Sequence, residues 1–162
     1  MFKPAPEAIA TVDLTERATA AGWILPDGWT VHADLTYDDH TAPDDFMSVD
    51  DHEPEYRDHE RMIREWFHRG DWGYGVVAVF VQDARGRDWG CSILGGVEMG
   101  TYPNSDGTST FIEPLEDTPG EYSVIREHDM IAEALRAAVR ELAAFGDPHG
   151  LIREPAVNYS GI

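Results

Sequence analysis

The chain has 162 residues, of which 42% are apolar and 10% aromatic, and this predicts a single globular domain with a buried core. Its 31 acidic and 12 basic residues give a formal charge of −19, which argues against direct binding to nucleic acid or to an anionic membrane. The one cysteine, Cys91, excludes an internal disulfide and a cysteine-based zinc site. Because we find no signal peptide and no stretch near the roughly 18 apolar residues of a membrane span, we expect a cytoplasmic protein.

The first part of the chain predicts a short helix followed by a half-buried strand. The helix covers residues 13–22, with Asp13 at its start and Gly22 at its end. Strict alternation of polar and apolar residues then predicts a strand that ends near residue 38. Its apolar face consists of Trp29, Val31, Ala33, Leu35 and Tyr37.

The middle of the chain predicts a loop, a helix and a central strand. Residues 38–50 show no periodicity and predict the loop, whereas residues 51–69 predict the helix. The strand at 72–82 is apolar on both faces, which is typical of a strand that is covered on both sides.

A second strand is expected to return antiparallel over residues 89–99. The pair Gly95-Gly96 inside it predicts a β-bulge or a close approach of the backbone. Cys91 is expected to be packed rather than reactive, because it belongs to the apolar face. That face consists of Trp89, Cys91, Ile93, Val97 and Met99.

The last part predicts a short strand at 109–113, a helix at 125–145 and an irregular tail at about 147–162. The helix has the clearest apolar stripe of the chain, formed by Ile131, Leu135, Ala138, Leu142 and Phe145. The whole order predicts one α+β domain over residues 1–162, with an antiparallel three- to four-stranded sheet packed by about three helices.

The negative charge is concentrated in two segments. Residues 34–60 contain eleven acidic residues and one base, and residues 98–121 contain six acidic residues and no base. Together these 51 residues carry −16, whereas the other 111 carry −3. A charge that served only solubility, or a halophilic habitat, would be spread over the whole surface.

Two further simple explanations cover part of this pattern. Three glutamates of the expected helix have an arginine four residues later, and each such pair stabilises a helix by roughly 0.2–0.5 kcal/mol. These pairs are Glu53–Arg57, Glu60–Arg64 and Glu65–Arg69. The aspartates of the loop and strand have no such arginine, so self-repulsion that leaves the loop disordered is the other explanation.

The hypothesis that covers both segments is imitation of a nucleic-acid backbone. Carboxylates two residues apart on a strand repeat every ~6.6 Å, which suits a row of arginines on a protein partner with a basic nucleic-acid-binding surface. The candidate partner-binding residues are Asp34, Asp38, Asp39, Asp44, Asp45, Asp50, Asp51, Glu55, Asp58, Glu113, Glu116 and Asp117. Since four of them, Asp38, Asp39, Asp44 and Asp45, lack an i+4 arginine, we expect their neutralisation to leave the fold intact.

Metal binding and nucleophilic catalysis are less well supported. His52 and His59 stand seven residues apart, about 10.5 Å on a helix, so they cannot bind one ion. A site built from His40, Asp44 and His52 is the alternative, and it would make the chain a metal-dependent enzyme that uses residues 38–60. We find no P-loop and no nucleophile elbow, and we therefore expect no catalytic residue, metal or cofactor.

The segment WGYGVVAVFVQDARGRDWGCSILGGVEMGTYP, followed by an alanine-rich amphipathic helix, resembles the small acidic accessory proteins of phages and plasmids. This resemblance covers roughly residues 72–145 and contains no diagnostic motif, so it assigns no site residue. It implies an anti-defence inhibitor of the anti-CRISPR or anti-restriction type, acting in the cytoplasm of the host cell. A structural or regulatory phage or plasmid protein is the further alternative.

Overall fold

The computed structural model describes residues 8–41, 64, 67–104, 106–116, 118, 120–146 and 150–156. The sheet has the order β1-β2-β3-β4-β5, and each strand pairs antiparallel with its neighbours in the chain. Its strands are β1 (Ala10–Asp13), β2 (Thr30–Tyr37), β3 (Trp72–Gln82), β4 (Asp88–Pro103) and β5 (Ser109–Ile112). The helices of the described part are α1 (Thr15–Ala20), α3 (Val124–Glu127) and α4 (Met130–Ala144).

This architecture is α+β, but the sheet has five strands instead of the expected three to four. The additional strand is β1, which precedes the helix that the sequence predicted at 13–22. Four residues are too few for a period-2 pattern to stand out, so β1 depends on its pairing with β2. Asp13 belongs to this strand, and its carboxylate accepts the backbone N–H of Thr15 at 2.8 Å, just before α1 begins.

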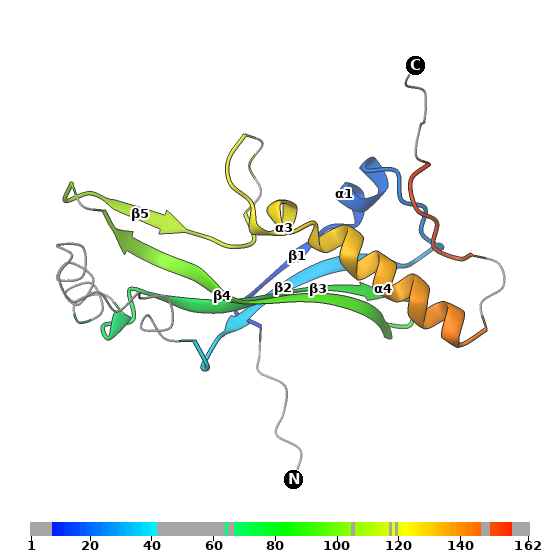
Figure 1. The fold of residues 1–162 in the computed structure, drawn as a ribbon, viewed down its shortest axis with the longest axis horizontal. Coiled ribbons are helices and arrows are strands. Elements are labelled where there is room, and N and C mark those ends of the chain that lie inside the picture. Colours follow the sequence, from blue (N-terminus) through cyan, green and yellow to red (C-terminus); the bar gives the residue numbers. More distant parts are fainter. Residues whose placement is uncertain are drawn as a thin grey trace, which may run out of the picture.

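The hydrophobic core lies between the sheet and the three described helices, which cover the same face of the sheet (Figure 1). Val77, Val79 and Val81 of β3 are fully buried at its centre. Gly90 of β4 lets α4 approach closely, because a Cβ atom there would lie 2.4 Å from the backbone nitrogen of Ala138. The close contact of α4 with β4 therefore requires a residue without a side chain.

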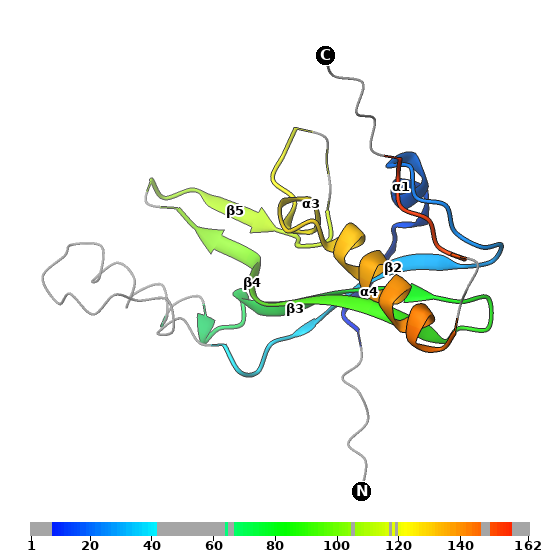
Figure 2. The ribbon, with the colours of Figure 1, turned by 45° about the vertical axis from the view of Figure 1, so that its right-hand side comes forward.

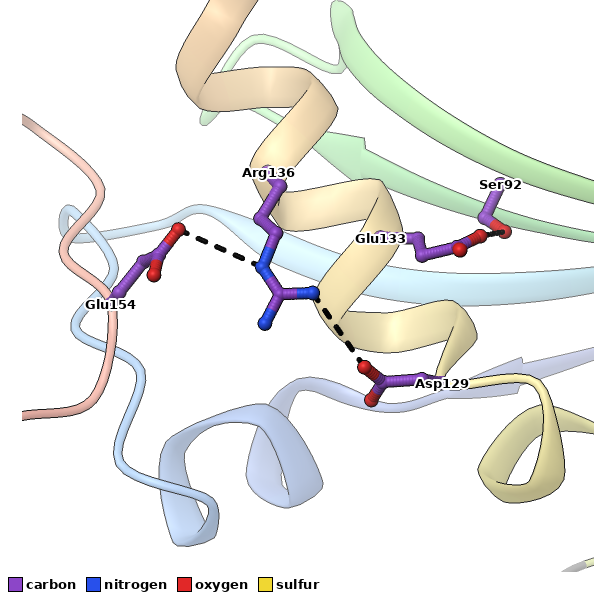
Figure 3. A network of polar contacts seen from close by, with 5 residues as sticks. All are labelled: Ser92, Asp129, Glu133, Arg136 and Glu154. Carbon is purple, nitrogen blue, oxygen red and sulfur yellow. Dashed lines mark hydrogen bonds and ion pairs between the residues drawn. The ribbon is translucent and has the colours of Figure 1, made fainter. Parts of the chain in front are cut away.

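Polar contacts fix α4 at its first turns (Figure 3). Glu133 accepts a hydrogen bond at 3.1 Å from the hydroxyl of Ser92, which is buried on β4. Arg136 forms ion pairs at 3.6 Å with Asp129, just before the helix, and at 3.7 Å with Glu154. These contacts connect the helix to the sheet and to the last described segment, 150–156.

Strand β4 contains the bulge that the sequence predicted at Gly95-Gly96. Val77 is opposite Leu94, whereas Gly75 is opposite Val97, so β4 has one residue more than β3 at this point. A second irregularity lies at Trp89, because Val81 pairs with Gly90 while Gln82 pairs with Asp88.

The two bulges overturn the predicted orientation of Cys91 and Ile93. Each extra residue reverses which side chains of the strand face the core. Cys91 and Ile93 lie between the two bulges and point away from the core, whereas Trp89 and Val97 point toward it. Cys91 is exposed rather than packed, and Ile93 is 62% exposed. Because the second bulge restores the orientation that the first one reversed, both ends of the strand fit the alternating pattern and the pattern does not reveal the change between them.

β3 has buried side chains on both faces, as the sequence predicted, but the two faces are covered by different groups. The described helices lie on one face in both views (Figures 1 and 2). On the opposite face, Trp72 and Tyr74 are buried by neighbouring aromatic rings instead. The ring of Phe67 lies 5.4 Å from that of Trp72, and the ring of Tyr102 lies 5.7 Å from it.

The expected helix at 125–145 begins earlier and is interrupted. Ser123 caps α3 by accepting the backbone N–H of Arg126 at 3.3 Å, and Asp129 separates α3 from α4 with a φ of 49°.

The outermost members of the predicted apolar faces are exposed, Tyr37 at 67% and Phe145 at 71%. Of the tail, Arg153 forms an isolated bridge with Ile24, so that part is less irregular than expected.

Most of the predicted helix at 51–69 lies outside the described residues, which include only 64 and 67–69 of it, and so does most of the loop at 38–50. Among the residues that are described, no helix is both long and apolar enough to cross a membrane.

Candidate acidic binding cleft

A cleft of about 660 Å³ lies between β4, β5 and the segment that leads into α3. Its lining contains four glutamates, one from β4 and three from the segment after β5. These are Glu98, Glu113, Glu116 and Glu121. It also contains two aromatic side chains that are each 70% exposed, Phe111 of β5 and Tyr122.

The β4–β5 hairpin forms one wall of the cleft. A tight turn closes the hairpin, because the N–H of Asn104 donates to the carbonyl of Thr108 at 2.8 Å. The carboxylate of Asp106 accepts the backbone N–H of Thr108 at 2.9 Å and its hydroxyl at 2.5 Å, and these bonds lower the pKa of Asp106. Figure 2 shows that this hairpin extends beyond the part of the sheet that the helices cover.

Gly100 is where the end of β4 turns toward β5. Its φ is 97°, a left-handed conformation that glycine adopts without strain. A Cβ atom at this position would also lie 2.4 Å from the carbonyl oxygen of Asp71. Glycine at this position therefore allows β4 to pair with β3 on one side and with β5 on the other.

The opposite wall is a sequence of turns held by short-range hydrogen bonds. The backbone N–H of Glu116 donates to the carbonyl of Glu113 at 3.1 Å. The hydroxyl of Thr118 donates to the carboxylate of Glu116, also at 3.1 Å, and the guanidinium of Arg126 donates to the carbonyl of Glu121. Since the three glutamates are exposed, these bonds hold the backbone while the carboxylates stay accessible.

The cleft is strongly negative. Among its described lining residues there is no lysine or arginine, and His128 is the one residue that could become positively charged. The pKa of Tyr102, which lies outside the lining, is raised, first by burial and second by the negative charge of Glu98. Carboxylates beside exposed aromatic rings form an environment that attracts cations, and guanidinium groups in particular.

The structure brings two of the predicted partner-binding residues, Glu113 and Glu116, into this cleft. It places Asp34 on the outer face of β2, where the carboxylate accepts the hydroxyl of Thr11 at 2.8 Å. The imidazole of His32 lies 4.0 Å from the same carboxylate. Asp39 is exposed in the turn after β2.

Asp38 has a structural role that its sequence position does not reveal. One carboxylate oxygen accepts the N–H of Gly96 at 2.8 Å and the hydroxyl of Thr41 at 2.5 Å, and the other accepts the N–H of His40 at 3.0 Å. Asp38 thereby ties the end of β2 to the bulge of β4, whose two glycines line the cleft. These contacts argue against the expectation that its neutralisation leaves the stability of the fold unchanged, and that expectation remains to be tested.

The other predicted partner-binding residues lie outside the described part of the chain: Asp44, Asp45, Asp50, Asp51, Glu55, Asp58 and Asp117. The other two glutamates of the cleft and its two exposed aromatic residues were not predicted as site residues, namely Glu98, Glu121, Phe111 and Tyr122. The absence of any base between residues 98 and 121 pointed to the two glutamates. No local pattern identified the two rings, because the exposure of Phe111 depends on how the hairpin projects and that of Tyr122 on the path of the chain before α3.

The described residues contain no group of three or more histidine, cysteine, aspartate or glutamate side chains that could hold a metal ion. Of the alternative metal site, His40 is described, whereas Asp44 and His52 are not. A comparison of the chain with protein-family models, curated protein sequences and solved structures found no match.

Proposed function

We propose that the protein is a non-enzymatic binding protein that uses the acidic cleft to engage a basic, nucleic-acid-binding surface of a protein partner. The observation that carries this proposal is the lining of the cleft, which combines four glutamates with two exposed aromatic rings and, among its described residues, no lysine or arginine. A guanidinium in such a cleft would gain charge-assisted hydrogen bonds and contacts with the ring faces.

The finer proposal is that the partner is a host defence complex whose nucleic-acid groove the protein blocks. Its support is the concentration of charge in two segments, of which the second forms this cleft. The first segment is also strongly acidic, so both would present carboxylates to a surface that binds phosphates. Resemblance to acidic anti-defence proteins adds the biological setting of an anti-CRISPR or anti-restriction inhibitor.

The test compares two variants with the same change in net charge. One replaces Glu98, Glu113, Glu116 and Glu121 with glutamine, and the control neutralises four exposed carboxylates outside the cleft. The control substitutions are Glu16→Gln, Asp27→Asn, Asp88→Asn and Glu141→Gln. Fluorescence anisotropy measures the affinity of each protein for a labelled hexa-arginine peptide between 50 mM and 500 mM NaCl.

We expect the cleft variant to bind the peptide at least tenfold more weakly than the parent, and the control less than threefold more weakly. The affinity of the parent should fall steeply with salt, because the Debye length shrinks as ionic strength rises. Equal losses in both variants would show that only the overall charge matters, and an affinity unchanged by salt would contradict the proposal. For the finer proposal, the parent should inhibit DNA binding by a restriction or CRISPR effector complex and the cleft variant should not.

A further inference from the structure

Strand β5 forms one edge of the sheet, and its four residues lack the charge, proline and bulge that protect many edge strands. Natural edge strands carry lysines, prolines or bulges that prevent another strand from pairing with them. The sequence of β5 is Ser-Thr-Phe-Ile, without charge or proline. Three of these residues, Ser109, Thr110 and Phe111, are exposed. Within the described part of the chain, no strand pairs with this side of β5, so the edge can accept an additional strand.

The hydrogen bonds around β4 show which backbone groups of β5 are available. Hydrogen-bonded and non-hydrogen-bonded pairs alternate along an antiparallel ladder. The N–H of Thr101 donates to the carbonyl of Asp71 at 2.7 Å, and so points away from Phe111, its partner on β5. The bond from Asn104 to Thr108 fits the same alternation, since Asn104 lies an odd number of residues from Thr101.

Phe111 and Ser109 therefore occupy the non-hydrogen-bonded positions of this ladder. At such positions the backbone N–H and C=O groups point to the outside of the pair, which for β5 is the free edge of the sheet. A new strand would find two N–H donors and two C=O acceptors there, spaced by two residues.

The free edge adjoins the acidic cleft, because Thr110, Phe111 and Ile112 line that cleft together with the four glutamates. The negative charge of the four glutamates favours some strands over others as partners of β5. A second copy of the chain would bring four more glutamates toward the first four, and like charges that face each other oppose association. An extended segment that carries cations would meet an opposite charge instead.

We propose that β5 receives an extended, arginine-containing segment of a protein partner as a sixth strand, with arginine side chains entering the acidic cleft. This inference rests on the proposed function and adds the mode of recognition. Backbone hydrogen bonds to Ser109 and Phe111 hold the segment, while the glutamates and rings select its side chains. Arginines at every second position would all lie on one face, about 6.6 Å apart.

The first experiment compares two peptides of equal charge on the intact chain. One is a fluorescein-labelled Arg-Thr-Arg-Thr-Arg-Thr peptide, and the other has the same sequence with methyl groups on its four internal backbone nitrogens. Methylation removes the backbone donors that a strand needs but leaves every guanidinium in place. We expect the methylated peptide to bind at least tenfold more weakly.

The second experiment tests the edge from the side of the protein. Proline in place of Ser109 removes an N–H that points to the free edge and takes no part in the β4–β5 ladder, whereas alanine at the same position keeps it. We expect Ser109→Pro to weaken binding of the unmethylated peptide by about fivefold and Ser109→Ala by less than twofold. Urea unfolding checks that both variants are folded. If Ser109→Pro does not fold, the comparison of the methylated and unmethylated peptides on the parent chain still tests strand addition.

The possible outcomes separate this inference from the proposed function. If both peptides bind equally well, binding is electrostatic only, so strand addition is wrong while the proposed function stands. If neither peptide binds, the proposed function fails as well. If sedimentation shows a dimer of the parent that Ser109→Pro abolishes, a second copy occupies the edge and the inference is overturned.

Discussion

At the scale of single residues, the same residue type has different roles in one acidic segment. Asp38 and Asp39 are adjacent in the sequence, but Asp38 accepts one hydrogen bond from strand β4 and two from the loop that follows β2, whereas Asp39 is exposed. The hydroxyl of Thr41, more than any other group, lowers the pKa of Asp38, and the N–H groups of Gly96 and His40 add to this effect.

We predict that Asp38→Asn destabilises the fold by about 1–2 kcal/mol, because an amide offers only one acceptor oxygen where two are used. The matched control, Asp39→Asn, should change the free energy of unfolding by less than about 0.5 kcal/mol. Urea unfolding at pH 7 measures both. Equal stability of the two variants would mean that the Asp38 contacts contribute nothing.

The hydrogen bonds to Asp38 also predict how its contribution to stability depends on pH. Since the folded-state pKa of Asp38 lies below its ordinary value of 3.8, its contribution is fully present above that value and is lost as the pH falls below it. The difference in melting temperature between the parent and Asp38→Asn should therefore shrink between pH 6 and pH 3. A difference that stays constant over this range would contradict the assignment.

At the scale of elements, the packing of α4 on β4 depends on one glycine. We predict that Gly90→Ala destabilises the fold by about 2 kcal/mol or more, because the added methyl group meets the backbone of α4 rather than a movable side chain. Gly73→Ala on β3 is the control, since its nearest neighbour would be a ring carbon of Phe67 at 3.9 Å. The shift of the urea midpoint should be large for the first variant and small for the second, and similar shifts would refute the close approach.

At the scale of the whole molecule, a formal charge of −19 on 162 residues opposes the compact state. Among the described residues, Arg136 has two carboxylate partners, but arginines are far too few to neutralise the acidic residues. Self-repulsion should therefore make the stability of the fold depend on ionic strength.

We predict that the melting temperature rises between 10 mM and 300 mM NaCl, because salt screens repulsion among exposed carboxylates. The cleft variant with four glutamines should be more stable than the parent at low salt and should gain less from added salt. A parent melting temperature that falls or stays flat over this range would show that attractive ion pairs outweigh the repulsion.

The sequence by itself determined the features that local patterns encode. Alternation placed β2 and β3 within a residue or so of their observed bounds, and Gly95-Gly96 marked the bulge. The count of acids and bases over residues 98–121 pointed to the negative segment that lines the cleft. Each of these depends on residues that are close together in the chain, so one sequence is sufficient to detect it.

Only the tertiary structure decided which groups meet across the chain. The second bulge, at Trp89, turns Cys91 and Ile93 outward, and no pattern within the strand reveals it because the register is set by pairing with β3. The partners of Asp38 include Gly96, 58 residues away in the sequence, so this carboxylate connects the end of β2 to β4. The cleft exists because the hairpin of β4 and β5 faces the segment before α3, and that arrangement follows from packing between distant residues.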